Sequence, residues 1–232
     1  MSPVVPLSSG VTMSLPAIKI CCIASLAEAQ AAISAGASAV GLVSSMPSGP
    51  GVIPDSLIAA IAEGIGGAAE SFLLTSRVEA DAIIEQHQRC RTTTLQLVDH
   101  VPLPELRRLR TALPRIRLVQ VIHVRDVESF GEALSAASMV DALLLDSGNP
   151  AAAIKELGGT GRTHDWALSR RIRDSVPRPV YLAGGLHAGN VADAVATVRP
   201  FGLDLCSGVR TDGRLDRVKL GAFFEAVRKV GT

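Results

Sequence analysis

The sequence predicts a single α/β domain, a (β/α)8 (TIM) barrel. Eight short apolar runs alternate with eight helical patterns, and 232 residues with 47% hydrophobic content are enough for one sizeable core. Strands that are apolar on both faces and separated by helices indicate a parallel sheet covered by helices. The competing fold, a doubly wound open sheet, usually has a glycine-rich turn after its first strand, where this chain has Cys-Cys-Ile-Ala-Ser.

The eight predicted units follow one another along the chain. The first strand, residues 17–23, precedes a helical pattern over residues 25–36, which starts with a candidate serine cap and ends with glycine. The later strands are predicted at residues 39–43, 70–76, 93–98, 117–124, 141–146, 178–185 and 201–208. The later helices, read from apolar residues three and four positions apart, are predicted at residues 54–65, 78–88, 103–113, 126–137, 165–176, 190–199 and 216–229.

Residues 17–232 are predicted to form the barrel domain and residues 1–16 a disordered N-terminal leader. The leader has no Lys or Arg and no long apolar run, which argues against a secretory signal and a membrane helix, and Met13 is an alternative start to Met1. The four cysteines lack C-x-x-C spacing, which favours a cytoplasmic protein without a zinc site or disulfide framework. A net charge of +1 argues against a nucleic-acid partner.

Reactive residues are expected at the carboxyl ends of the strands, because barrel active sites lie there. Cys21 and Cys22 fall near the end of the first strand, where alternation should direct one side chain to the barrel axis and the other outward. A structural buried cysteine is the alternative interpretation of either one. Asp146 ends the sixth strand, where a carboxylate can transfer protons, cap a helix or form a structural salt bridge.

Three glycine-containing segments predict a phosphate site. One is GGTGRT, in the long loop after the sixth strand, and the others end the seventh and eighth strands, where barrels often bind phosphate. Glycine lets backbone N–H groups approach an anion closely, although each segment taken alone could be a simple turn. The candidate phosphate ligands are Gly159, Thr160, Gly161, Gly184, Gly185, Ser207 and Gly208.

Several motifs together resemble the phosphoribosylanthranilate isomerase family over nearly the whole chain after residue 17. They are KIC at the first strand, LLLD before GGTGRTHDW, LAGGL followed by NV, and VRPFGLDLCSGV. The resemblance implies an Amadori rearrangement of a phosphorylated aminosugar, with no cofactor and no metal. It further implies that Cys21 is the general base that removes the C2′ proton and Asp146 the general acid that protonates the ring oxygen. The candidate substrate-binding residues are Lys19, Gln96, Arg162, Asp204 and Arg210.

The chain departs from the family pattern where the family holds the anthranilate carboxylate. Pro50 stands at the place of an arginine, and Val98 at the place of a histidine. Asp99 would repel a carboxylate if it faced the pocket. Arg210 stands where the family often has Glu, and it could bind the substrate acid instead. Cys22 replaces the glycine after the base and could supply a second thiol.

Three functions stay open on these grounds. The first is isomerisation of phosphoribosylanthranilate with a variant pocket, and the second is the same isomerisation of another N-substituted aminosugar phosphate. The third is a phosphosugar-binding barrel without catalysis, in which Cys21 belongs to the core and Asp146 anchors a loop. No membrane partner is expected, and the protein could be a monomer or a homodimer.

Overall fold

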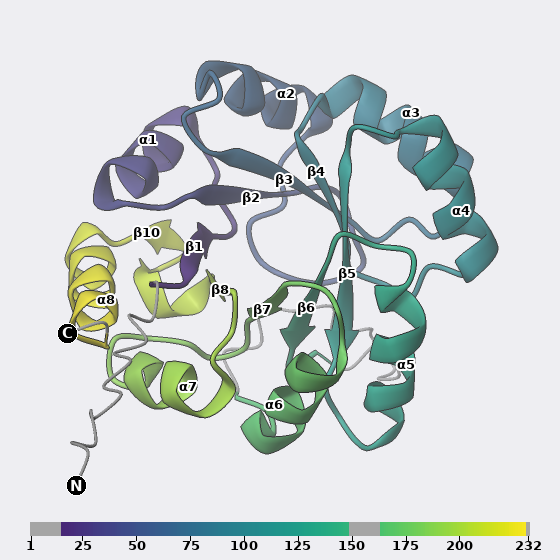
Figure 1. Ribbon diagram of the computed structural model, residues 1–232. Coiled ribbons are helices and arrows are strands. Elements are labelled where there is room, and N and C mark those ends of the chain that lie inside the picture. Colours follow the sequence, from purple (N-terminus) through teal and green to yellow (C-terminus); the bar gives the residue numbers. More distant parts are fainter. Residues whose placement is uncertain (1–14, 149–162, 231–232) are drawn as a thin grey trace, which may run out of the picture.

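The computed structural model describes residues 15–148 and 163–230, and eight parallel strands in it form a closed barrel. Each strand pairs with the next along the chain, and β1 (Ala17–Ile20) pairs with β8 (Gly202–Leu205) to close the ring. Figure 1 shows the strands at the centre of the molecule and the helices around them. The predicted (β/α)8 barrel is therefore confirmed.

The other elements follow in the predicted order. The remaining barrel strands are β2 (Ala39–Val43), β3 (Glu70–Thr75), β4 (Thr94–Leu97), β5 (Arg117–His123), β6 (Ala142–Asp146) and β7 (Val180–Leu182). The helices are α1 (Leu26–Ala35), α2 (Asp55–Gly64), α3 (Ala80–Cys90), α4 (Leu103–Ala112), α5 (Glu128–Ala137), α6 (Trp166–Ser175), α7 (Val191–Val198) and α8 (Arg217–Val230). A 3-10 helix, η1 (Ser207–Val209), and a hairpin of β9 (Arg210–Thr211) and β10 (Arg214–Leu215) lie between β8 and α8.

Several strands are shorter than the apolar runs that predict them. The first run continues to residue 23, but β1 ends at Ile20, and Cys22 has a left-handed backbone with φ of 61°. The seventh run continues to residue 185, but β7 ends at Leu182, and the two glycines after Ala183 have φ of 83° and 62°. Left-handed residues cannot continue a strand, so these apolar segments become loops at the barrel mouth.

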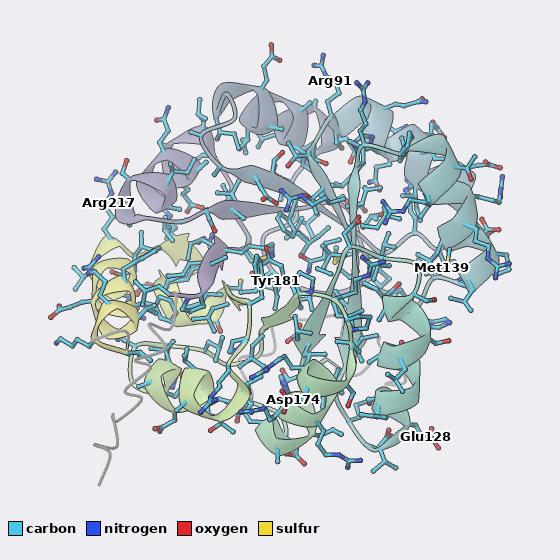
Figure 2. All side chains as sticks on the ribbon, in the orientation of Figure 1. Arg91, Glu128, Met139, Asp174, Tyr181 and Arg217 are labelled. Carbon is cyan, nitrogen blue, oxygen red and sulfur yellow. The ribbon has the colours of Figure 1, made fainter. Side chains whose placement is uncertain are left out.

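Alternation of side chains along the strands produces two apolar layers. Outward-facing residues such as Ile20, Leu73 and Leu143 pack with the helices in one large core. Inward-facing residues, among them Phe72 and Tyr181, form a second cluster that fills the barrel. Figure 2 shows Tyr181 in the middle of the ring, while Arg91, Glu128 and Arg217 lie at the edge of the molecule. The barrel interior is therefore a packed core rather than a channel.

A buried ion pair joins the first and last strands inside the barrel. Lys19 and Asp204 are register partners on β1 and β8, and Lys19 Nζ lies 2.8 Å from Asp204 Oδ1. The Lys19 side chain is fully buried and also lies over the ring of Phe72, 5.3 Å from its centroid. Burial opposes the ammonium charge, but Asp204 and two nearby thiols outweigh it and raise the Lys19 pKa.

Two predictions concern segments outside the described residues. The leader, apart from its last two residues, and the GGTGRT segment, apart from Thr163, fall in residues 1–14 and 149–162. Within the described residues, no helix is both long enough and apolar enough to cross a membrane.

The buried ion pair generates a stability prediction. Lys19→Met leaves the Asp204 carboxylate buried without its cation, so we expect the free energy of unfolding to fall by about 3–5 kcal/mol. Urea denaturation measures the change. Lys229→Met is the matched control, because Lys229 pairs with Glu225 on the exposed side of α8, where solvent screening leaves such a pair little effect on stability. Equal losses in the two variants would contradict the role of the buried pair.

Candidate active site

A cavity opens at the carboxyl ends of the barrel strands, where the sequence places the active site. It encloses about 630 Å³, including open space at its mouth, a size suited to a small organic ligand. Residues from β2, β3, β4, β6 and β8 and from the loops that follow β1, β2, β7 and β8 line it. Of the predicted site residues, the cavity brings together Cys21, Gln96, Asp146, Gly184, Gly185, Asp204 and Ser207.

Both cysteines at the end of β1 line this cavity, which corrects the expectation that one of them packs outward. Strand alternation ends at Ile20, and the left-handed conformation of Cys22 turns its side chain back to the same side as Cys21. A β carbon added to Gly41 on β2 would lie 2.8 Å from Cys21 Sγ, so this glycine makes room for the thiol. Three thiols, with Cys206 after β8, share the cavity wall.

The neighbours of Cys21 favour its thiolate. Hydrogen bonding from the Cys22 thiol lowers the Cys21 pKa, burial acts in the opposite direction, and the positive charge of Lys19 lowers the pKa further. The pKa of Cys22 is raised instead, by interactions with Cys206 and Cys21 and by burial. Cys21 is thus the thiol in this group that is suited to act as a base.

Asp146 has the opposite tendency. Its side chain is buried at the end of β6, and this burial raises the pKa of the carboxyl above its usual range. The Ser147 N–H donates to Asp146 Oδ1 over 2.7 Å, and this contact, together with the neighbouring His123 ring, only partly offsets the rise. The cavity therefore contains a thiol biased towards its anion and a carboxyl biased towards its neutral form.

The predicted substrate-binding residues on the strands have different roles. Gln96 lines the cavity, and its buried Oε1 has no hydrogen-bond partner among the described residues, so it is available to a ligand. Asp204 also lines the cavity, although Lys19 already occupies one of its oxygens. Lys19 itself does not line the cavity wall, so it is not placed to contact the substrate directly. Its ammonium group instead pairs with Asp204 and acts electrostatically on Cys21.

The loops after β7 and β8 meet closely at one end of the cavity. A β carbon on Gly208 would overlap the carbonyl oxygen of Leu186, so the two backbones touch at this point. Gly208 does not itself line the cavity, whereas Gly184, Gly185 and Ser207 do. The Asn190 side chain fixes the first loop, because it accepts from the His187 N–H over 2.9 Å and donates to the Gly185 carbonyl over 3.0 Å. These glycines can present backbone N–H groups to an anion.

The cavity wall near β2 is apolar or uncharged. Val43, Met46, Ser48, Gly49 and Pro50 form it. Within the described residues, the ionisable acidic side chains on the cavity wall are those of Asp146 and Asp204, and no lysine or arginine lines it. Four candidate ligands, Gly159, Thr160, Gly161 and Arg162, lie outside the described residues.

The structure corrects the sequence-based view of Arg210. This side chain does not line the cavity, and its guanidinium donates to the backbone carbonyls of Cys21 and Cys22 and pairs with Glu28. Both of its terminal nitrogens donate inside the protein, so Arg210 is not retained as a ligand of the substrate acid. Asp99 is also absent from the cavity wall, and Val98 packs in the inner apolar cluster.

Three residues near the site were not among the predicted site residues. Glu28 pairs with Arg210, and Asn190 orders the loop after β7. His123 is the register partner of Asp146 and contacts the Val98 carbonyl oxygen over 3.0 Å through Nε2. Asn190 could have been found from the sequence, because an asparagine directly before a helix is a common N-cap. The roles of Glu28 and His123 depend on contacts between segments that are distant in the sequence. Among the described residues, no group of three or more His, Cys, Asp or Glu is arranged to hold a metal.

Comparisons with known proteins agree on one family. The family model described as N-(5'phosphoribosyl)anthranilate (PRA) isomerase matches residues 18–226. The N-(5'-phosphoribosyl)anthranilate isomerase of Methanosarcina acetivorans is 33% identical over 225 residues, which cover 91% of this chain and 92% of that protein. The isomerase of Halorubrum lacusprofundi is 34% identical over 208 residues, covering 89% of this chain and 94% of that protein.

Solved structures give the same result. The phosphoribosyl anthranilate isomerase of Thermotoga maritima has a TM-score of 0.79 at 27% identity, covering 93% of this chain and all of that one. A phosphoribosyl anthranilate isomerase in complex with reduced 1-(o-carboxyphenylamino)-1-deoxyribulose 5-phosphate has a TM-score of 0.77 at 25% identity, with the same coverage.

The close contact of the two glycine loops generates a prediction. Gly208→Ala forces the loops after β7 and β8 apart, so we expect the affinity for inorganic phosphate, measured by calorimetry, to fall on the order of ten-fold or more. Gly221→Ala is the control, because a β carbon there meets no atom within 4 Å. Unchanged phosphate affinity in Gly208→Ala would contradict the predicted phosphate site.

Proposed function

The chain belongs to the N-(5'-phosphoribosyl)anthranilate isomerase family, and on that premise we propose that Cys21 and Asp146 are the general base and general acid of its reaction. The protein is an isomerase that converts N-(5'-phosphoribosyl)anthranilate to the corresponding 1-deoxyribulose 5-phosphate, a step of tryptophan biosynthesis. The observation that carries the residue assignment is that Cys21 and Asp146 line one cavity at the carboxyl ends of the strands, where their surroundings lower the pKa of the thiol and raise that of the carboxyl.

The proposed reaction begins with ring opening. The neutral Asp146 carboxyl donates its proton to the ring oxygen as the C1′–O bond breaks, and the nitrogen lone pair forms a C1′=N bond. The Cys21 thiolate then removes the proton from C2′, and the electrons of that C–H bond form a C1′–C2′ double bond as the nitrogen is neutralised. Tautomerisation of this enol to the ketone gives the 1-amino-1-deoxyketose phosphate. Each group begins in the ionisation state that its surroundings favour.

The two ends of the cavity suit the two ends of this substrate. The phosphate is proposed to bind at Gly184, Gly185 and Ser207, with Gly208 holding the loops together. Gln96 and Asp204 face the sugar, and the apolar wall near β2 receives the aromatic ring. Gly159, Thr160, Gly161 and Arg162 remain proposed ligands from the sequence.

A second candidate function rests on the uncharged wall near β2. Because Pro50 lines the cavity and no cation of the described residues does, the same isomerisation of an N-substituted aminosugar phosphate without a carboxylate is the alternative. Loss of one charge-assisted hydrogen bond costs about 1.5–3 kcal/mol, which is on the order of ten- to a hundred-fold in affinity.

The assembly and location of the protein belong to the same proposal. A solved isomerase from Thermotoga maritima is described as dimeric, and we propose a monomer or homodimer for this chain. The four cysteines are free, which supports a reducing compartment such as the cytoplasm.

Turnover of phosphoribosylanthranilate, followed by loss of its fluorescence, tests the proposed function. We expect the wild-type protein to convert this substrate. In both Cys21→Ser and Asp146→Asn the turnover rate should fall by about 10²- to 10⁴-fold, since this is the usual contribution of a general acid or base. Circular dichroism controls for folding. A folded protein that converts only another aminosugar phosphate would support the alternative, and one with no turnover would leave a binding function.

The pKa shifts predict the pH profile of kcat/KM. Turnover falls at low pH as the thiolate is protonated and at high pH as Asp146 ionises. Because the Cys21 pKa is lowered and the Asp146 pKa raised, the low-pH limb should lie below the ordinary thiol value of about 8.5, and the high-pH limb above the ordinary carboxyl value of about 3.9. Asp146→Asn cannot ionise and should lose the high-pH limb, whereas Asp174→Asn on the surface should keep it. A high-pH limb that survives in Asp146→Asn would assign it to another group.

A further inference from the structure

Arg210 lies directly behind the turn that carries Cys21. Its Nη2 donates to the Cys21 carbonyl oxygen over 3.1 Å and to the Cys22 carbonyl oxygen over 2.5 Å. Its Nη1 donates to the Gly213 carbonyl oxygen over 3.0 Å. Because the side chain is only 6% exposed, these contacts are shielded from water. One guanidinium thus joins the end of β1 to the β9–β10 hairpin.

The turn itself needs such a partner. Cys22 has φ of 61°, a left-handed conformation that is unfavourable for a residue with a β carbon. It also lies just past the end of β1, where carbonyl groups leave the regular ladder. Buried carbonyls require donors, and Arg210 supplies them to both consecutive peptides. The guanidinium therefore stabilises a backbone geometry that the local sequence does not favour.

Glu28 holds Arg210 in place. Its carboxylate oxygens lie 3.4 Å and 3.2 Å from the two Nη atoms. The same carboxylate accepts from the Leu215 N–H over 2.9 Å and from the Ala24 N–H over 3.0 Å. Glu28 therefore connects the start of α1, the β10 strand and the guanidinium.

We propose that Arg210, held by Glu28, is a positioning residue that fixes the Cys21–Cys22 peptide so that the Cys21 thiolate faces the C2′ proton. The inference rests on the proposed role of Cys21 as the general base. The space for Sγ beside Gly41 is narrow, so a small shift of the Cys21 backbone moves the sulfur out of line. Misplacement of a reacting group by about 1 Å costs on the order of 100-fold in rate.

The geometry separates this role from substrate binding. Arg210 does not line the cavity, and its two terminal nitrogens donate to backbone oxygens and to Glu28. Its loss should therefore lower kcat and leave KM nearly unchanged. A lysine at this position has a single ammonium group in place of a planar group with several donors, so it can form only some of the hydrogen bonds that Arg210 makes.

The experiment compares Arg210→Met, Arg210→Lys and Glu28→Gln with the control Arg214→Met. Arg214 lies on the exposed face of the same hairpin. We measure kcat and KM for phosphoribosylanthranilate and the pH dependence of Cys21 alkylation by iodoacetamide, followed by peptide mass spectrometry. Arg210→Met is expected to lower kcat on the order of 10- to 100-fold with little change in KM, and to alter the alkylation profile. Arg210→Lys should restore part of kcat, and the control should match wild type.

The outcomes separate this inference from the proposed function. If Arg210→Met has wild-type kcat and an unchanged alkylation profile, Arg210 does not position the base. Should Arg210→Met not fold, the same criterion applies to Arg210→Lys. A rise in KM without a fall in kcat would also overturn the inference. Cys21→Ser is measured beside them: if it keeps full turnover, the assignment of Cys21 as base fails first, whatever the Arg210 variants show.

Discussion

Lys19 Nζ and Asp204 Oδ1 lie 2.8 Å apart between the first and last strands, inside a barrel that is otherwise filled by apolar side chains. Neither charge could be buried there alone, so the pair has to form when β1 and β8 come together. The same pair places the positive charge of Lys19 near Cys21, where it favours the thiolate, while the Asp204 carboxylate acts in the opposite direction. Closure of the barrel and the electrostatics of the active site therefore depend on one interaction.

The two carbonyls after β1 show a similar link between packing and chemistry. Cys22 adopts a left-handed turn, which directs two neighbouring thiols into the cavity and leaves the carbonyls to be satisfied by Arg210. A cysteine and an arginine that look like separate departures from the family pattern are thus in contact in the fold. This contact explains why Arg210 is unavailable to the substrate carboxylate.

The sequence was sufficient for the fold because periodicity is local: each apolar run and each helical pattern can be recognised within a dozen residues. It was also sufficient to place Cys21, Asp146, Gly184 and Gly185 at one edge, since barrel topology brings the strand ends together. It failed where the answer depended on distant partners. Lys19 pairs with a residue 185 positions away and Arg210 with Cys21 over 189 positions, and neither contact leaves a local pattern.

The central claim is that one cavity keeps the Cys21 thiol ionised and the Asp146 carboxyl neutral. Thiolate absorbance in the ultraviolet, recorded against pH as the difference between wild type and Cys21→Ser, tests it most directly. The account predicts a titration centred below the ordinary thiol pKa of about 8.5, and a shift towards higher pH in Lys19→Met wherever that variant is folded. A Cys21 titration at or above the ordinary value would contradict it.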